Sequence, residues 1–101
     1  MTWGSTLITM ARPLKEIDES VTRNPTAAVA LGLVVRRRRL ELERSQEDLA
    51  TEGMEQSFLS KIERGETEVS ISSFLILAER LDMEPDVLMS TLINVMKHGA
   101  Q

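Results

Sequence analysis

The stretch SQEDLATEGMEQSFLSKIERG, residues 45–65, carries two helix signals separated by a glycine. Ser45 can cap a helix, and an acid three residues later, Asp48, gives a weaker form of the capping box. Gly53 is expected to end this helix, because glycine accepts the left-handed backbone that reverses the chain. A second helix is predicted over residues 56–64, and Gly65 ends it.

The second of these helices has one apolar and one polar face. Phe58, Leu59 and Ile62 recur at helical spacing and are predicted to face inward. The side chains predicted to face outward are small, polar or basic: Gln56, Ser57, Ser60, Lys61 and Arg64. Two short helices joined by a glycine turn have the geometry that lays the second helix in the major groove of B-DNA.

The outward side chains are of types that can read base edges. Gln56 can pair bidentately with adenine, Lys61 can donate to guanine acceptors, and Ser57 can do either more weakly. Gln46 stands at the start of the helix that Ser45 caps, where it would meet a phosphate together with the backbone N–H groups of that helix terminus. The stretch therefore predicts a partner, double-stranded DNA.

The flanking sequence predicts three more helices and no strand. One spans residues 27–42, with Asn24 as its cap and Pro25 in its first turn. Another follows the cap Ser70 over residues 71–81, and the last runs from Pro85 to Gly99. Five residues are expected to form the buried face of the helix after Ser70: Phe74, Leu75, Leu77, Ala78 and Leu81.

These elements predict an all-α, compact five-helix domain over residues 25–101. Residues 1–24 form an N-terminal extension, in which Leu14, Ile17 and Val21 recur at helical spacing. Both a short amphipathic helix and a partly flexible tail remain open for this extension.

Composition excludes several classes of function. The chain has no cysteine and a single histidine, His98, so neither a zinc site nor a catalytic dyad can be built from them. We expect no enzymatic activity, cofactor, metal or small-molecule ligand. No apolar run reaches membrane-spanning length and the first residues lack a secretion signal, so a cytoplasmic location without membrane contact is expected.

The net charge of −4 does not by itself favour a nucleic-acid partner. Local basic surface matters more than the total, and residues 36–39 are four consecutive arginines. From residue 45 to residue 65 the chain carries five acids and only two bases. DNA affinity is therefore expected to depend on arginines of the helix over residues 27–42, with Arg36 and Arg37 near phosphates. It is also expected to depend on two subunits acting together.

Three segments resemble the phage-repressor and Cro family of helix-turn-helix regulators, often called the XRE family. They are VRRRRLEL (residues 35–42), SQEDLA (residues 45–50) and SFLSKIERG (residues 57–65). The resemblance implies a lambda-repressor-like five-helix fold and a transcriptional regulator that binds DNA. The compact format with an apolar last helix is also similar to the controller proteins of restriction–modification systems.

The resemblance assigns a role to each matched position. It implies that Gln56, Ser57 and Lys61 face the bases, while Gln46 contacts the DNA backbone. Arg64 would reach a flanking phosphate, and Ser60 on the same face is placed with the phosphate contacts. In this family an arginine of the first helix of the domain, here residues 27–42, commonly pairs with a glutamate at the end of the third helix, here residues 56–64. Here that structural ion pair would join Arg39 and Glu63.

The sequence also departs from the family pattern at the turns. Glu43 and Arg44 stand where glycine and an apolar residue are usual, and Val69 replaces a common proline. The spacing from Ala50 to Gly53 is one residue shorter than usual, which shortens either the helix that Ser45 caps or the turn after it. The helix over residues 56–64 is the predicted recognition helix, through which the protein would bind DNA. Acids at positions 52 and 55 border this helix and would repel phosphates.

The last helix, about residues 85–98, is expected to hold two subunits together. Leu88, Leu92 and Val95 can cover the domain's own core. The residues predicted for the homodimer interface are Met89, Leu92, Ile93 and Met96. Two recognition helices about 34 Å apart would read an inverted-repeat operator.

Other readings stay open alongside a DNA-binding regulator. An antitoxin that autoregulates its own operon shares the same format. A protein-interaction module of the same fold, without DNA binding, would also explain the acidic surroundings of the recognition helix.

Overall fold

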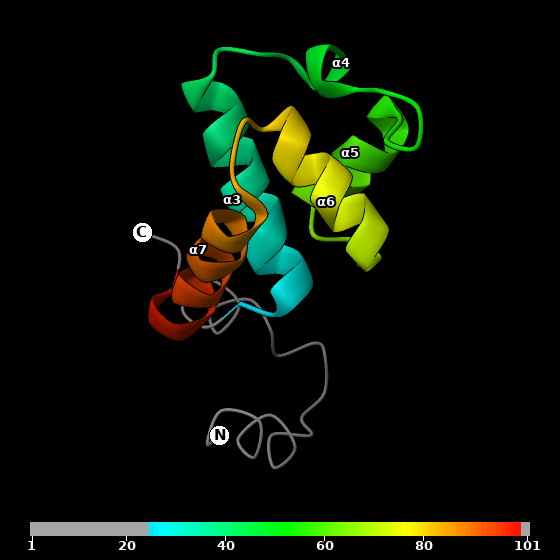
Figure 1. Ribbon diagram of the computed structural model, residues 1–101. Coiled ribbons are helices and arrows are strands. Elements are labelled where there is room, and N and C mark those ends of the chain that lie inside the picture. The colour runs from blue at the N-terminus through cyan, green and yellow to red at the C-terminus, as the bar shows by residue number, and fades with distance from the viewer. Residues whose placement is uncertain (1–24, 100–101) are drawn as a thin grey trace.

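The computed structural model describes residues 25–99, and the elements in that range are helices. They are α3 (Ala27–Glu41), α4 (Gln46–Leu49), α5 (Gln56–Glu63), α6 (Ile71–Arg80) and α7 (Pro85–His98). Figure 1 shows α3 in the middle of the bundle, and α3 packs against both α5 and α7. The predicted all-α, five-helix domain is confirmed; the helix predicted within residues 1–24 lies outside the described residues.

Side-chain caps fix where the helices begin. Ser45 and Asp48 form a complete capping box at α4, and the Ser70 hydroxyl accepts a hydrogen bond from the Ser73 N–H at α6. At α3 the cap is Thr26. Pro25 precedes this cap, so its predicted place in the first turn is wrong, and Asn24 lies outside the described residues. The starts predicted after Ser45 and Ser70 are confirmed.

Three helices end in the same hydrogen-bonded turn, the Schellman motif. The first residue after each helix's C-cap has a positive φ: 57° at Glu43, 71° at Gly65 and 59° at Asp82. In each motif the following residue donates its N–H to a carbonyl five residues back. These bonds are Arg44 N to Arg39 O (3.1 Å), Glu66 N to Lys61 O (3.0 Å) and Met83 N to Ala78 O (3.0 Å).

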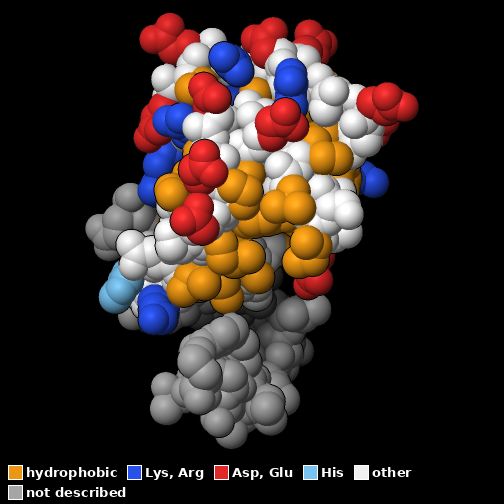
Figure 2. All heavy atoms as spheres, in the orientation of Figure 1, with side chains coloured by type: hydrophobic (Ala, Val, Ile, Leu, Met, Phe, Trp, Pro, Cys, Tyr) orange, Lys and Arg blue, Asp and Glu red, His pale blue; other side chains and the backbone are white. Residues whose placement is uncertain are grey.

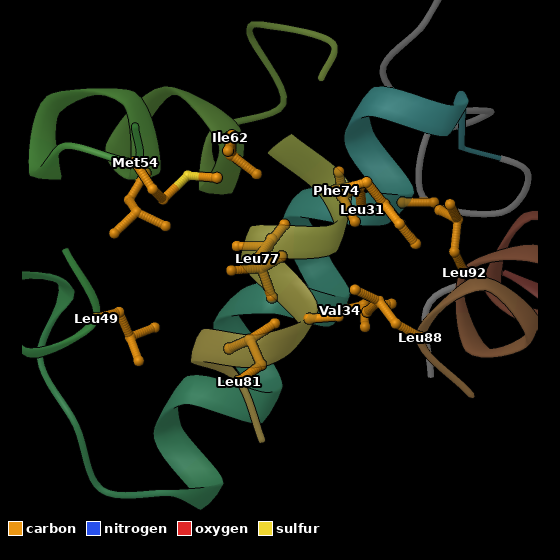
Figure 3. Close-up of a cluster of buried hydrophobic side chains, with 14 of the residues drawn as sticks. Leu31, Val34, Leu49, Met54, Ile62, Phe74, Leu77, Leu81, Leu88 and Leu92 are labelled. Atoms are coloured by element: carbon orange, nitrogen blue, oxygen red, sulfur yellow. The ribbon is translucent and has the colours of Figure 1, made fainter. Parts of the chain in front are cut away.

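One hydrophobic core joins the helices. Figure 3 shows side chains from α3, α6 and α7 converging, among them Val34, Leu77 and Leu88. The predicted inward face of α7 is confirmed, since Leu88, Leu92 and Val95 are all buried. On α6 the prediction is wrong for Leu75, which is 49% exposed. Its position lies at the edge of the α6 apolar face, and the helices of the bundle leave that edge uncovered.

Gly32 lets α3 and α5 approach closely. A Cβ atom at this position would lie 2.3 Å from the Ile62 carbonyl oxygen and 2.9 Å from that of Glu63. Any side chain here would therefore separate the two helices. Glycine inside a helix is ordinarily only a weak point, whereas here it is the point of contact between α3 and α5.

None of the helices within residues 25–99 combines the length and apolarity that crossing a membrane would take.

Candidate nucleic-acid interface

The helix-turn-helix unit consists of α4, a tight turn and α5. α4 has only four residues and ends at Leu49, because Ala50 is already extended. Thr51 and Met54 then exchange backbone hydrogen bonds of 3.0 and 2.8 Å, and Gly53 has a φ of 85° between them. The prediction that Gly53 ends the helix is wrong in detail. The glycine shapes the turn, while the helix ends four residues earlier.

α5 presents one face to solvent and the other to the core. Leu59 and Ile62 are fully buried, and Phe58 is partly buried beside them. Met54, buried in the turn before α5, adds to this anchor. Three residues predicted to contact bases are all exposed: Gln56, Ser57 and Lys61. The arrangement leaves a polar helix face open to solvent on a rigid backing.

Behind α5, Arg39 and Glu63 form a buried ion pair. Arg39 Nε donates to Glu63 Oε2 at 2.6 Å, and Nη2 donates to Oε1 at 3.0 Å. The Glu63 side chain is 3% exposed. Hydrogen bonding to this carboxylate raises the pKa of Arg39 further above its ordinary value. Because Arg39 Nη1 also donates to the Arg44 carbonyl, the pair ties α3, α5 and the α3–α4 turn together.

The same carboxylate begins a chain of hydrogen bonds that reaches the outward face. Gln46 Nε2 donates to Glu63 Oε1 at 3.0 Å. Gln56 Nε2 in turn donates to Gln46 Oε1 at 2.8 Å. Gln46, the predicted phosphate contact, is thus engaged at both ends of its amide by protein groups. Gln56 keeps its Oε1 and one N–H for an outside partner, with its orientation set from behind.

The other predicted phosphate contacts lie on α3 and at the end of α5. Arg36 and Arg37 are exposed, and Arg36 Nη1 lies 3.9 Å from Glu63 Oε1. Arg64 donates through Nη1 to the Ser60 hydroxyl, and through Nε and Nη2 to Glu66. Ser60 of α5 and Arg64, the C-cap of this helix, therefore share one site.

Two further arginines hold the backbone around this unit, and sequence reasoning missed both. Arg80 of α6 donates to the Leu49 carbonyl at 2.8 Å and to that of Asp48 at 3.0 Å, at the end of α4. Arg38 of α3 donates to the carbonyls of Leu81 and Asp82 after α6. No spacing in the sequence indicates these contacts, because donor and acceptor lie more than thirty residues apart.

Acidic groups surround the interface. Figure 2 shows acidic side chains around the end of the molecule that carries α4, and Glu47, Glu52 and Glu55 are all exposed. Glu63 is neutralised by its partner, so it adds little to this field. The exposed acids would repel a phosphate backbone that came too close.

Solved structures show where this geometry recurs. The restriction–modification controller protein C.Esp1396I, solved as a tetramer in complex with its natural 35 base-pair operator, is similar over 70% of this chain and 95% of its own. The two share 26% identity, with a TM-score of 0.64. The controller protein C.AhdI from Aeromonas hydrophila is 39% identical over 60% of this chain and 94% of its own, with a TM-score of 0.56.

A third similar structure is the clp gene regulator ClgR from Corynebacterium glutamicum. It is 25% identical over 71% of this chain and 95% of its own, with a TM-score of 0.65. A search of curated protein sequences found no match. A helix-turn-helix family model matches residues 35–88, which is more than half of the 101 residues. The matched range contains α4, α5 and α6 entirely, and the chain therefore belongs to the helix-turn-helix family.

Proposed function

We propose that this protein is a sequence-specific transcriptional regulator that binds double-stranded DNA through α5. The observation that carries the proposal is the exposed face of α5, where Gln56, Ser57 and Lys61 stand over the buried Leu59 and Ile62. An α-helix of this kind fits the major groove, and glutamine and lysine have the donors and acceptors that distinguish base pairs there. Similar proteins are controllers and a gene regulator rather than enzymes.

Phosphate contacts would come from both sides of the recognition helix. Arg64 and Ser60 supply one group at the end of α5, and Arg36 and Arg37 supply another on α3. These contacts carry no base information but fix the position of α5 in the groove. The role proposed for the Arg39–Glu63 pair is structural, since both side chains are buried.

The protein would act as a homodimer in the cytoplasm. Figure 2 shows apolar side chains gathered over α6 and α7 on one face of the molecule. The exposed apolar residues of these helices are Ile71, Leu75, Val87, Met89 and Ile93. An apolar surface of this extent on a small domain is typical of an interface between proteins. A second copy related by a two-fold axis would bury it and present two α5 helices to an inverted repeat.

The predicted interface set needs one correction. Leu92 is buried in the chain's own core, so it does not reach a partner, and Met96 is partly covered by the same core. Met89 and Ile93, both exposed, remain from the set. Ile71 and Leu75 of α6 were not predicted and extend the candidate surface beyond α7.

Sedimentation of an Ile93 variant tests the dimer. Ile93→Glu places a charge on the proposed interface and is expected to shift the dimer to monomer, with weaker operator binding as a consequence. Leu40→Glu is the matched control, because Leu40 is an exposed apolar residue of α3, outside the surface formed by α6 and α7. Equal self-association of the two variants and the wild type would refute this interface.

A mobility-shift assay tests DNA binding itself. The wild type is compared at low salt with the double variant Gln56→Ala, Lys61→Ala on the same set of duplexes. Loss of two base contacts is expected to weaken specific binding at least about tenfold. The double variant Asn94→Ala, Lys97→Ala removes the same kinds of polar group from exposed positions on α7 and is expected to bind normally.

The alternative of a protein-interaction module rests on the exposed acids around α4 and the turn. It predicts that neither the wild type nor any variant shifts a duplex at low salt. That result would overturn the proposed function. Binding upstream of the protein's own gene would instead fit either a controller protein or an autoregulating antitoxin.

A further inference from the structure

The end of α5 carries an ion pair on the face proposed to meet DNA. Arg64 Nε and Nη2 donate to the two carboxylate oxygens of Glu66 at 2.8 and 3.1 Å. Both side chains are about half exposed, so the pair lies at the surface. The third nitrogen of the guanidinium, Nη1, donates to the Ser60 hydroxyl. All three guanidinium nitrogens of Arg64 therefore have a partner within the protein.

The backbone fixes Glu66 in this position. Gly65 adopts a φ of 71°, and the Glu66 N–H then donates to the Lys61 carbonyl at 3.0 Å. This Schellman turn brings residue 66 back over the last turn of the helix. The carboxylate is thus held beside Arg64 by the same hydrogen bonds that end α5.

Glu66 changes the charge of the recognition surface. Lys61 and Arg64 are the two basic residues between positions 45 and 65. Hydrogen bonding with Arg64, and then the charges of Arg64 and Lys61, lower the pKa of Glu66, so the carboxylate stays ionised at neutral pH. A bidentate carboxylate occupies an arginine edge that could otherwise bind two phosphate oxygens.

We propose that Glu66 competes with the DNA backbone for Arg64 and thereby limits the affinity of the recognition helix for DNA. This inference rests on the proposed DNA-binding function and adds a residue that tunes it. When DNA binds, phosphate oxygens replace the carboxylate at Arg64, and the ion pair must open. The opposite role is that Glu66 holds Arg64 in the right direction for a phosphate, and it predicts the opposite effect of substitution.

The test uses Glu66→Gln in the full chain, with the inverted-repeat duplex selected by the wild type as probe. The amide keeps the shape of the side chain and removes its charge. Affinity is expected to rise about two- to fivefold per subunit, the range of a surface ion pair. The dependence of log K on log salt should change little, because Arg64 meets the same phosphate in both proteins once the ion pair has opened.

Two further variants separate a specific effect from general charge. Glu68→Gln removes one negative charge from an exposed residue two positions along the chain. It is expected to change affinity less than Glu66→Gln does. In an Arg64→Ala background, Glu66→Gln should raise affinity no more than Glu68→Gln does, because the competition then has no target.

The outcomes are distinct. A rise in affinity that depends on Arg64 supports competition by Glu66. Unchanged or weaker binding by Glu66→Gln overturns it, and weaker binding assigns Glu66 the orienting role. In the Arg64→Ala background, a gain in affinity from Glu66→Gln that is larger than the gain from Glu68→Gln also overturns it. If the wild type binds no duplex, the proposed function fails first, and this inference falls with it.

Discussion

The α-carbon of Gly32 in α3 faces the carbonyl group of Ile62 in α5 so closely that a Cβ atom on Gly32 would lie 2.3 Å from that oxygen. This contact sets the distance between the central helix and the proposed recognition helix. The Arg39–Glu63 ion pair joins the same two helices further along. The position of α5 is therefore fixed from α3 at two points.

We expect Gly32→Ala to destabilise the protein, by about 1–3 kcal/mol, because α3 and α5 must separate to make room for the methyl group. Helix propensity alone predicts the opposite sign, since alanine stabilises a helix interior by roughly 0.5–1 kcal/mol over glycine. Chemical denaturation decides between the two, and a variant more stable than the wild type would rule out the close contact.

Glu43 occupies the left-handed position of the α3 C-terminal turn, with a φ of 57°. A side chain in this conformation costs roughly 1–2 kcal/mol, partly offset by the greater backbone entropy that glycine loses on folding. We expect Glu43→Gly to raise the free energy of unfolding by about 0.5–1 kcal/mol. Glu43→Ala removes the same carboxylate but keeps the Cβ atom, and it should show no such gain.

Loss of Arg39 would leave Glu63 buried without its main partner. We expect Arg39→Met to lower the free energy of unfolding by about 3–5 kcal/mol, because a buried charge without a partner is costly. The double variant Arg39→Met, Glu63→Leu removes both charges and is expected to recover much of this loss. Equal stability of the single and double variants, measured by denaturation, would argue against a buried charge penalty.

The capping box of α4 makes the free energy of unfolding depend on pH in the acid range. The hydrogen bond from the Ser45 backbone N–H, followed by that with the Ser45 side chain, lowers the pKa of Asp48 from its usual 3.8. At pH values above the pKa that Asp48 has in the unfolded chain, the carboxylate therefore contributes its full stabilisation to the folded state. This contribution is lost as the pH falls through the lower pKa that Asp48 has in the folded protein. The stability difference between wild type and Asp48→Ala should shrink from about pH 6 to about pH 3. Curves that stay parallel over this range would contradict the assignment.

Gln46 and Gln56 are expected to act as a unit in base recognition. Gln46→Ala removes the hydrogen bond that orients Gln56, so discrimination at the base pair read by Gln56 should fall. Gln56→Ala should have an equal or larger effect, and the double variant should lose little more than Gln56→Ala alone. Additive losses, measured on single-base operator variants, would show that the two residues act independently.

Local signals in the sequence predicted most of the fold. The capping box at Ser45 and Asp48, the cap at Ser70 and the apolar spacing of α7 each act within a few residues, so they can be read along the chain. The exposed side chains of α5 followed from the same helical spacing. Helix ends were less predictable, since α4 ends at Leu49 although Gly53 is the nearest glycine.

Contacts between distant residues could not be predicted in the same way. Arg80 reaches the carbonyls at the end of α4 across thirty-one and thirty-two residues, and nothing in the spacing of charges marks this arginine among the others. Leu75 and Leu92 were both predicted to face the core, yet Leu75 is exposed and Leu92 is buried, because the packing of the helices decides which edge of each apolar face is covered. The engagement of Gln46 by Glu63 and Gln56 likewise depends on the fold.

Selection of bound duplexes from a random library, carried out in parallel for the wild type, Gln56→Ala and Lys61→Ala, tests the role of α5 most directly. We predict that the wild type selects an inverted repeat, and that each variant loses its preference at a symmetric pair of positions within it. Selection of the same motif by all three proteins, or of no motif by the wild type, would contradict recognition of DNA by this helix.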